Sequence, residues 1–144
     1  MQLKGPSTTI LYSIEEAIKA YRKMSLKRIK TAIPDITVDQ ALILQIIHDK
    51  QLTQTEIADL IFKDYASMTR IIKLMIKKGY LSKMPNEKDK RTAVLTITPK
   101  GKQAVQQLAP IIHQNRQTAL AGLSLDELNH LKNTLNTITQ NCKQ

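Results

Sequence analysis

The sequence predicts a mainly α-helical fold with one small β-hairpin. Two observations carry this prediction. Apolar residues recur at spacings of three and four over most of the 144 residues, the pattern of amphipathic helices, and they alternate with polar residues at residues 92–98. Aromatic residues make up 3% of the chain, so aliphatic side chains on helices must supply the core, which argues against an all-β fold. Length and composition fit one globular domain over residues 1–144.

The first predicted helix belongs to a segment at residues 7–33. Its apolar positions, among them Ile10 and Ile14, fall on one stripe. Proline disfavours helical geometry in the residue before it, so Pro34 is expected to end the segment.

Three more helix starts follow. Thr37 and Thr53 each begin a capping box, in which a hydroxyl and a side chain three residues later satisfy free backbone N–H groups. Asp64 is expected to cap the next helix, residues 64–78, which stops at Gly79. The last two of these helices therefore meet through a tight turn. The apolar face of the helix that begins at Thr53 is predicted to hold Ile57, Leu60 and Ile61.

A β-hairpin is predicted after this pair of helices. Its strands are residues 80–84 and 92–98, and the second strand alternates apolar and polar side chains. Residues 85–91 between them are polar and form the tip.

Two helices complete the predicted order. Thr98 and Pro99 begin a long helix that reaches about residue 120, with Pro110 expected to bend or interrupt it. Ser124 begins the last helix with another capping box. The narrow apolar seam of this helix consists of Leu128, Leu131, Leu135 and Ile138.

Positive charge is concentrated on the helix pair and the hairpin. The net charge is +10, and residues 63–102 hold eleven Lys and Arg against three acidic residues. Arg70, Lys73 and Lys77 lie along one face of the helix at 64–78, opposite its Ile and Met face. A solvated surface helix would show the same pattern, but the basic hairpin directly after it favours binding of double-stranded DNA.

The positions of these residues assign roles on DNA. The first turns of the helix are expected in the major groove, where Arg70 can pair with guanine through two hydrogen bonds. Lys73 and Lys77 are expected to hold phosphates. The hairpin is expected to act as a wing that places Lys88 or Arg91 at the minor groove or the backbone. The candidates for base contact are Tyr65, Ala66, Ser67, Thr69 and Arg70.

Three stretches, residues 52–58, 67–81 and 89–101, resemble the MarR (multiple antibiotic resistance regulator) family of bacterial transcription factors, and the likeness covers nearly the whole chain. The resemblance implies a winged helix-turn-helix lobe at residues 37–101 and dimerisation helices at residues 7–33 and 102–141. It also implies that Asp89 steadies the wing while Arg91 reaches DNA. Tyr65 and Ala66 depart from the family pattern, which leaves the base preference open.

A homodimer is also expected, because narrow apolar seams on terminal helices need a partner surface. Alternatively, these apolar seams only pack within the core of a monomer. Two-fold symmetry predicts a palindromic operator. The family resemblance implies a repressor whose DNA affinity a small-molecule ligand lowers. The candidate dimerisation residues are Ile10, Ile14, Leu128, Leu131, Leu135 and Ile138.

Other classes of protein find little support. Glycine-rich phosphate loops, nucleophile elbows and paired catalytic carboxylates are absent from the sequence, so neither an enzyme nor a cofactor is predicted. His48, His113 and His130 lack metal-ligand spacing. A single Cys142, with no signal sequence and no long apolar run, leads us to expect a cytoplasmic protein. Two alternatives stay open: a module that docks an acidic protein partner, and a peripheral membrane binder.

Overall fold

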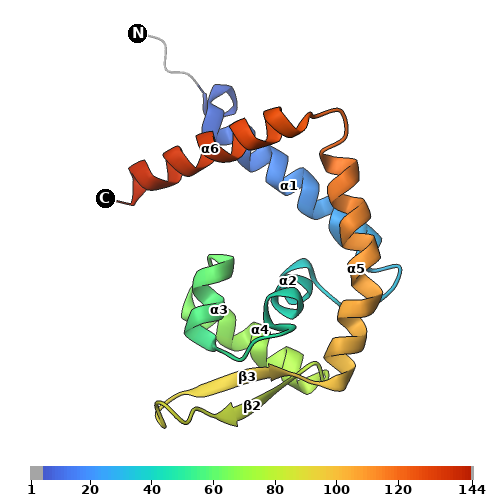
Figure 1. Ribbon diagram of the computed structural model, residues 1–144, viewed down its shortest axis with the longest axis vertical. Coiled ribbons are helices and arrows are strands. Elements are labelled where there is room, and N and C mark those ends of the chain that lie inside the picture. Colours follow the sequence, from blue (N-terminus) through green and yellow to red (C-terminus); the bar gives the residue numbers. More distant parts are fainter. Residues whose placement is uncertain (1–4, 144) are drawn as a thin grey trace.

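The computed structural model describes residues 5–143, and it has a small mixed lobe from which long helices extend (Figure 1). The predicted mainly α fold with a hairpin is confirmed. The lobe contains α2 (Val38–Ile47), α3 (Gln54–Ile61), α4 (Tyr65–Lys77), β1 (Leu52–Thr53), β2 (Leu81–Pro85) and β3 (Ala93–Ile97). The long helices are α1 (Ile10–Ile29), α5 (Pro99–Ala119) and α6 (Leu125–Cys142), and a 3-10 turn at Pro6–Thr8 precedes α1.

The predicted helix starts are confirmed in detail. Thr37, Thr53 and Ser124 each close a capping box at the start of α2, α3 and α6. Asp64 caps α4 by accepting from the backbone N–H of Ser67 at 2.7 Å. Each of these side chains satisfies a backbone group that the first helical turn leaves free, so the helix boundaries are encoded locally.

The hairpin is the larger part of a three-stranded antiparallel sheet in the order β1-β3-β2. Leu81 of β2 faces Ile97 of β3, and Leu52 of β1 faces Leu95. Leu81 and Leu95 are buried under the helices, whereas the far end of the hairpin projects from the lobe (Figure 1). Strand β1 was not predicted, because two residues are too few to show an alternating pattern.

The hydrophobic core joins the lobe to the bases of two long helices. Ile29 near the end of α1 and Leu108 within α5 are fully buried together with residues of the lobe. The lobe is therefore anchored to α1 and α5 by shared packing. The fully buried lobe residues at its centre are Ile43, Leu44, Ile47, Ile57, Met68, Ile72 and Met75.

Two local expectations were wrong, and of the bend or interruption expected at Pro110 the interruption is absent. Leu60 was placed on the core face of α3, but it is 54% exposed, because Ile57, Ala58 and Ile61 already fill the buried side of this eight-residue helix. Pro110 does not interrupt α5; it lies on the exposed side, where water can solvate the carbonyl that loses its N–H partner. The first helix ends at Ile29, before the predicted limit of residue 33.

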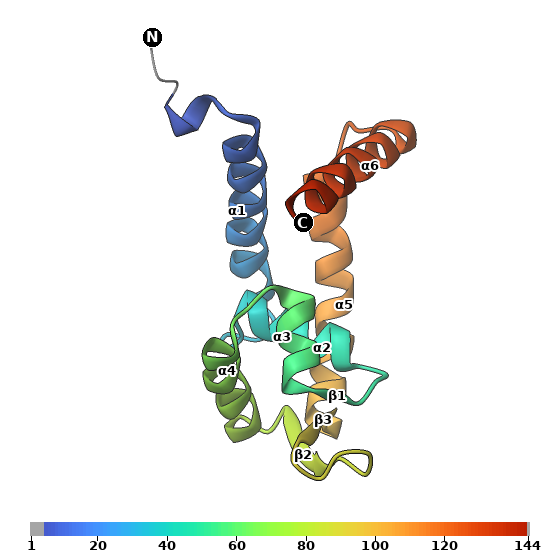
Figure 2. The same ribbon diagram turned by 90° about the vertical axis from the view of Figure 1, so that its left-hand side faces the viewer.

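Helix α6 stands apart from the rest of the chain. No residue of α6 is buried, and Figure 2 shows it separated from α1 by an open space above the lobe. Leu131 in its apolar seam is 48% exposed, and Ile10 at the start of α1 is 71% exposed. Within residues 5–143, no helix has the length and apolar content that crossing a membrane requires.

Candidate nucleic-acid interface

Helices α3 and α4 form a helix-turn-helix that is fixed by polar contacts. Phe62 ends α3 in the left-handed region with a φ of 60°, which turns the chain sharply towards α4. Gln54 at the start of α3 donates from its side-chain nitrogen to Thr69 Oγ1 at 2.8 Å and to the Tyr65 carbonyl oxygen at 3.3 Å. The first turns of the two helices are thereby held together.

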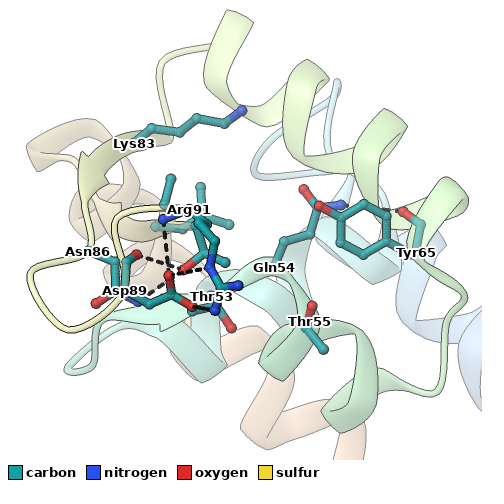
Figure 3. Close-up of a pocket in the computed structure, with 11 residues that line it drawn as sticks. Thr53, Gln54, Thr55, Tyr65, Lys83, Asn86, Asp89 and Arg91 are labelled. Carbon is teal, nitrogen blue, oxygen red and sulfur yellow. Dashed lines mark hydrogen bonds and ion pairs between the residues drawn. The ribbon is translucent and has the colours of Figure 1, made fainter.

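A cleft of about 410 Å³ separates the start of α4 from the wing. Figure 3 shows Asn86, Asp89 and Arg91 of the wing on one side and Gln54 and Tyr65 on the other. Polar and cationic groups from three elements therefore face one open space, which suits a charged, extended ligand such as a DNA backbone. The full lining is Thr53, Gln54, Thr55, Tyr65, Lys83, Asn86, Asp89, Arg91, Thr92, Ala93 and Leu95.

The tip of the wing is ordered by Asp89. Its Oδ1 accepts from the backbone N–H of Arg91 at 3.0 Å and from Arg91 Nε at 3.1 Å, and Oδ2 accepts from Arg91 Nη2 at 3.3 Å. These hydrogen bonds lower the pKa of Asp89 below its usual range. Asn86 Nδ2 also donates to Thr92 Oγ1 at 3.0 Å across the tip. The Arg91 side chain is nevertheless 90% exposed. Its guanidinium therefore remains accessible while the hydrogen bonds to Asp89 orient it.

The structure brings some of the predicted DNA-binding residues together and leaves others apart. Tyr65 and Arg91 line the same cleft, with Asp89 beside Arg91. Lys88 instead lines a separate hollow on the hairpin, together with Gln51 and Glu87. The remaining residues with exposed side chains, Ala66, Arg70, Lys73 and Lys77, lie along α4 outside the cleft.

Ser67 and Thr69 have hydroxyl groups that already serve the fold. The Ser67 hydroxyl donates to Asp64 Oδ2 at 2.9 Å, and the Thr69 hydroxyl donates to the Tyr65 carbonyl oxygen at 3.0 Å. Both side chains are only partly exposed. Any contact that they make to a base must therefore use the methyl group of Thr69 or share hydrogen bonds that are already formed.

Sequence reasoning gave no DNA-binding role to six polar residues of the cleft, among them Thr53, which caps α3, and Thr92, which precedes β3. Gln54 and Thr55 begin α3, Lys83 projects from β2, and Asn86 follows that strand. Lys83 falls in the basic stretch of the sequence, and this charge was the available signal. Gln54 and Thr55 are neutral residues that approach the wing because β1 pairs with β3, whereas Asn86 belongs to the wing itself.

A second cavity lies between α1, α2 and α5. It measures about 250 Å³, and most of its lining is apolar, from residues such as Ile18, Leu42 and Ile112. Arg22, Ser25 and Arg116 bring polar groups to it. The hydroxyl of Ser25 is buried without a hydrogen-bond partner in the described part of the chain, as is Nδ2 of the neighbouring α5 residue Asn115. A buried polar group without a partner marks a place where a water molecule or a ligand would be stabilised.

Residues 5–143 contain no group of three or more His, Cys, Asp and Glu side chains close enough to hold a metal ion. Cys142 is exposed at the end of α6.

Comparison with known proteins shows a similarity to one family of regulators. Residues 35–92 match the model of the MarR family. YwaE of Bacillus subtilis, described as an uncharacterized HTH-type transcriptional regulator, is 31% identical over 90 residues, which cover 62% of this chain and 53% of YwaE. The similarly described YybA of the same organism is 26% identical over 121 residues, covering 83% of this chain and 81% of YybA. The chain is therefore similar to the MarR family over residues 35–92, and to these two regulators over longer stretches.

A solved structure supports the fold of this chain. A mutant MarR from Escherichia coli, in complex with operator DNA, superposes with a TM-score of 0.84 at 21% identity, covering 96% of this chain and 99% of that one. At this identity the likeness shows the fold, a winged helix-turn-helix with terminal helices. The family and the curated relatives are regulators, in agreement with the prediction that the chain is not an enzyme.

Proposed function

We propose that this chain is a MarR-family transcriptional regulator that binds double-stranded DNA as a homodimer, with α4 in the major groove and the wing, residues 85–91, on the minor groove or backbone. The cleft between the start of α4 and the wing carries the proposal, because Tyr65, Lys83 and Arg91 face it from three different elements. The complex of E. coli MarR with operator DNA is consistent with this use of the fold.

In this proposal Arg70 reads bases and Lys73 and Lys77 bind phosphates. All three side chains are exposed on α4, whose opposite side is buried through Met68, Ile72 and Met75. Burial of that side fixes the helix on the lobe, so the cationic side is presented to a partner without loss of core packing.

The homodimer is formed by the terminal helices. Helix α6 has 18 residues and an apolar seam of which no residue is buried by the described part of the chain, residues 5–143. Leu128, Leu135 and Ile138 of this seam are half-buried, and Ile10 and Leu131 are more exposed. A second copy that packs against α1 and α6 would remove this surface from water and would place two copies of α4 on a palindromic operator.

A small-molecule effector fits the cavity between α1, α2 and α5. The apolar walls suit a hydrocarbon or aromatic body, and Arg22, Arg116 and Ser25 suit an acidic or hydroxyl group. A ligand there would lie between α1 and the lobe that carries α4. The effector lowers operator affinity in this proposal, and the regulator is then a repressor.

Selection of bound duplexes from a random pool tests the function. We expect a palindromic sequence to be enriched and to be bound in a gel shift at physiological salt. Arg70→Ala should reduce the discrimination between operators by about 1–3 kcal/mol at one base pair of each half-site. Lys102→Ala, which removes a surface lysine outside α4 and the wing, is the matched control. Failure to enrich any sequence, with retained binding of an acidic protein, would favour a protein-docking module instead.

A further inference from the structure

Asp39 lies where three parts of the molecule meet. It is the second residue of α2, and its Oδ1 accepts from Arg22 Nη2 of α1 at 2.5 Å. Its Oδ2 contacts Lys63 Nζ at 3.3 Å. Lys63 belongs to the turn between α3 and α4 and comes two residues before Tyr65 begins α4. One carboxylate therefore ties a long terminal helix to the turn of the helix-turn-helix.

This bridge is partly shielded from water. The Asp39 side chain is 19% exposed, and those of Arg22 and Lys63 are each 37% exposed. Burial of the carboxyl acts to raise the pKa of Asp39, but the hydrogen bonds and charges of Arg22 and Lys63 outweigh it, so the pKa lies below its ordinary value. The group is ionised at neutral pH, and its removal would leave two neighbouring cations without their shared partner.

A second tie holds the other end of α4. Lys78, which caps α4, donates to the backbone carbonyl of Asp35 and to Gln40 Oε1 at 3.3 Å, and it lies 3.9 Å from Asp35 Oδ2. This tie reaches only the segment at the start of α2. Among the salt bridges of residues 5–143, the bridge at Asp39 alone includes a residue of α1. Asp35 therefore provides a matched comparison for Asp39.

We propose that Asp39 is a positioning residue that fixes the direction of α4 relative to α1. Phe62, the first residue of the turn before α4, is 92% exposed, so its ring adds no packing that would fix the turn relative to α1. The chain of contacts from Arg22 through Asp39 to Lys63 supplies that constraint.

The proposal has a consequence for DNA recognition. In a dimer joined by its terminal helices, the direction of α4 relative to α1 sets the separation of the two recognition helices. That separation sets the half-site spacing that the dimer accepts. The inference rests on the proposed function and adds to it a residue that touches no DNA.

Distance measurements test the geometry without DNA. Lys19 of α1 and Lys73 of α4 are both exposed, so each can be replaced by cysteine and spin-labelled in a full-length Cys142→Ser background. Labelled chains are diluted with unlabelled chains, and double electron–electron resonance reports the separation within one chain. We expect a single narrow distribution in the parent, a broader one in Asp39→Asn, and the parental distribution in Asp35→Asn. A parental distribution in folded Asp39→Asn would overturn the inference.

A second variant keeps the test decisive if Asp39→Asn does not fold. Arg22→Gln removes the arm to α1 and leaves the Asp39–Lys63 contact in place. We expect it to broaden the distribution in the same way, whereas Asp39→Glu should retain the narrow one. If Arg22→Gln is folded by circular dichroism and keeps the parental distribution, the bridge does not position α4.

Operator binding supplies the functional readout. The selected palindrome is lengthened or shortened by one base pair between its half-sites, and the Kd of each duplex is measured. For each protein, the Kd of the duplex with altered spacing is divided by the Kd of the duplex with the original spacing. This Kd ratio should be about fivefold smaller in Asp39→Asn than in the parent, at the low end of measured coupling effects. Equal ratios in the two proteins would overturn the inference. A parent that selects no DNA would refute the proposed function instead, and the spin-label distances would still decide the role of Asp39.

Discussion

Replacement of Gly101 by alanine should push α5 away from the start of β2. Gly101 is the third residue of α5 and is buried. A Cβ at this position would lie 2.4 Å from the backbone oxygen of Tyr80 and 2.6 Å from Cγ1 of Ile97. The Tyr80 oxygen cannot move freely, because it accepts the backbone N–H of Thr98, which caps α5, at 3.0 Å.

The size of the stability loss depends on which atoms must move to make room for the new methyl group. A flexible side chain could rotate away from the new methyl group, but the nearest atom is backbone, so α5 has to shift relative to β2. Overpacking of a core costs about 1–3 kcal/mol, and a backbone collision belongs at the upper end, about 2–3 kcal/mol. A change of 1 kcal/mol shifts the Tm of a domain of this size by about 4 °C, so Gly101→Ala should lower the Tm by about 8–12 °C.

Thermal unfolding followed by far-ultraviolet circular dichroism measures this change. Gly122→Ala is the matched control, because a Cβ there meets nothing within 4 Å and the only cost comes from its φ of 84°. A left-handed residue with a side chain costs about 1–2 kcal/mol, so the control should lose less than Gly101→Ala. A Tm for Gly101→Ala at or above that of the control would refute the close packing of α5 on Tyr80.

Four further predictions concern single residues. Phe62→Gly should stabilise the chain by about 0.5–1 kcal/mol in urea unfolding, because it relieves a left-handed residue whose ring is 92% exposed, and a loss of stability would show that the ring packs on a partner. Arg91→Ala should weaken operator binding in gel shifts and leave the Tm nearly unchanged, since its side chain is 90% exposed; unaltered affinity would exclude the wing contact. Lys77→Ala should weaken binding to all duplexes alike and flatten the slope of log K against log salt by about one unit, whereas a loss of affinity that depends on the DNA sequence would contradict a phosphate contact. Ionised Asp39 contributes stability that is present above the ordinary carboxyl pKa and is lost as pH falls through its lowered pKa, so Asp39→Asn should flatten the stability curve below about pH 5, and parallel curves for the two proteins would contradict this.

Local sequence signals predicted most of the fold. Thr37, Thr53, Asp64 and Ser124 satisfy backbone groups within their own first turns, so each helix start is encoded in four consecutive residues. Gly79, with a φ of 86°, ends α4 for an equally local reason. The wing was predictable as well, because its strands are joined by a short polar tip.

Features that depend on distant contacts were not predictable. Gln54 and Thr55 approach the wing only because β1 pairs with β3, more than 40 residues away along the chain. The unpartnered Ser25 hydroxyl becomes notable only when α1, α2 and α5 enclose it. Asp39 reads as an ordinary acidic residue in the first turn of a helix, and its bridge to Arg22 and Lys63 requires the packed structure.

The exposed position of α6 links folding to concentration. Most helical stability in proteins comes from packing of an apolar face, so an 18-residue helix with no buried residue draws little support from its own chain. If a second copy covers its seam, helical order in α6 and association are the same event. The thermal midpoint would then rise as the protein is concentrated, and dilution would fray the carboxyl-terminal segment before the lobe unfolds.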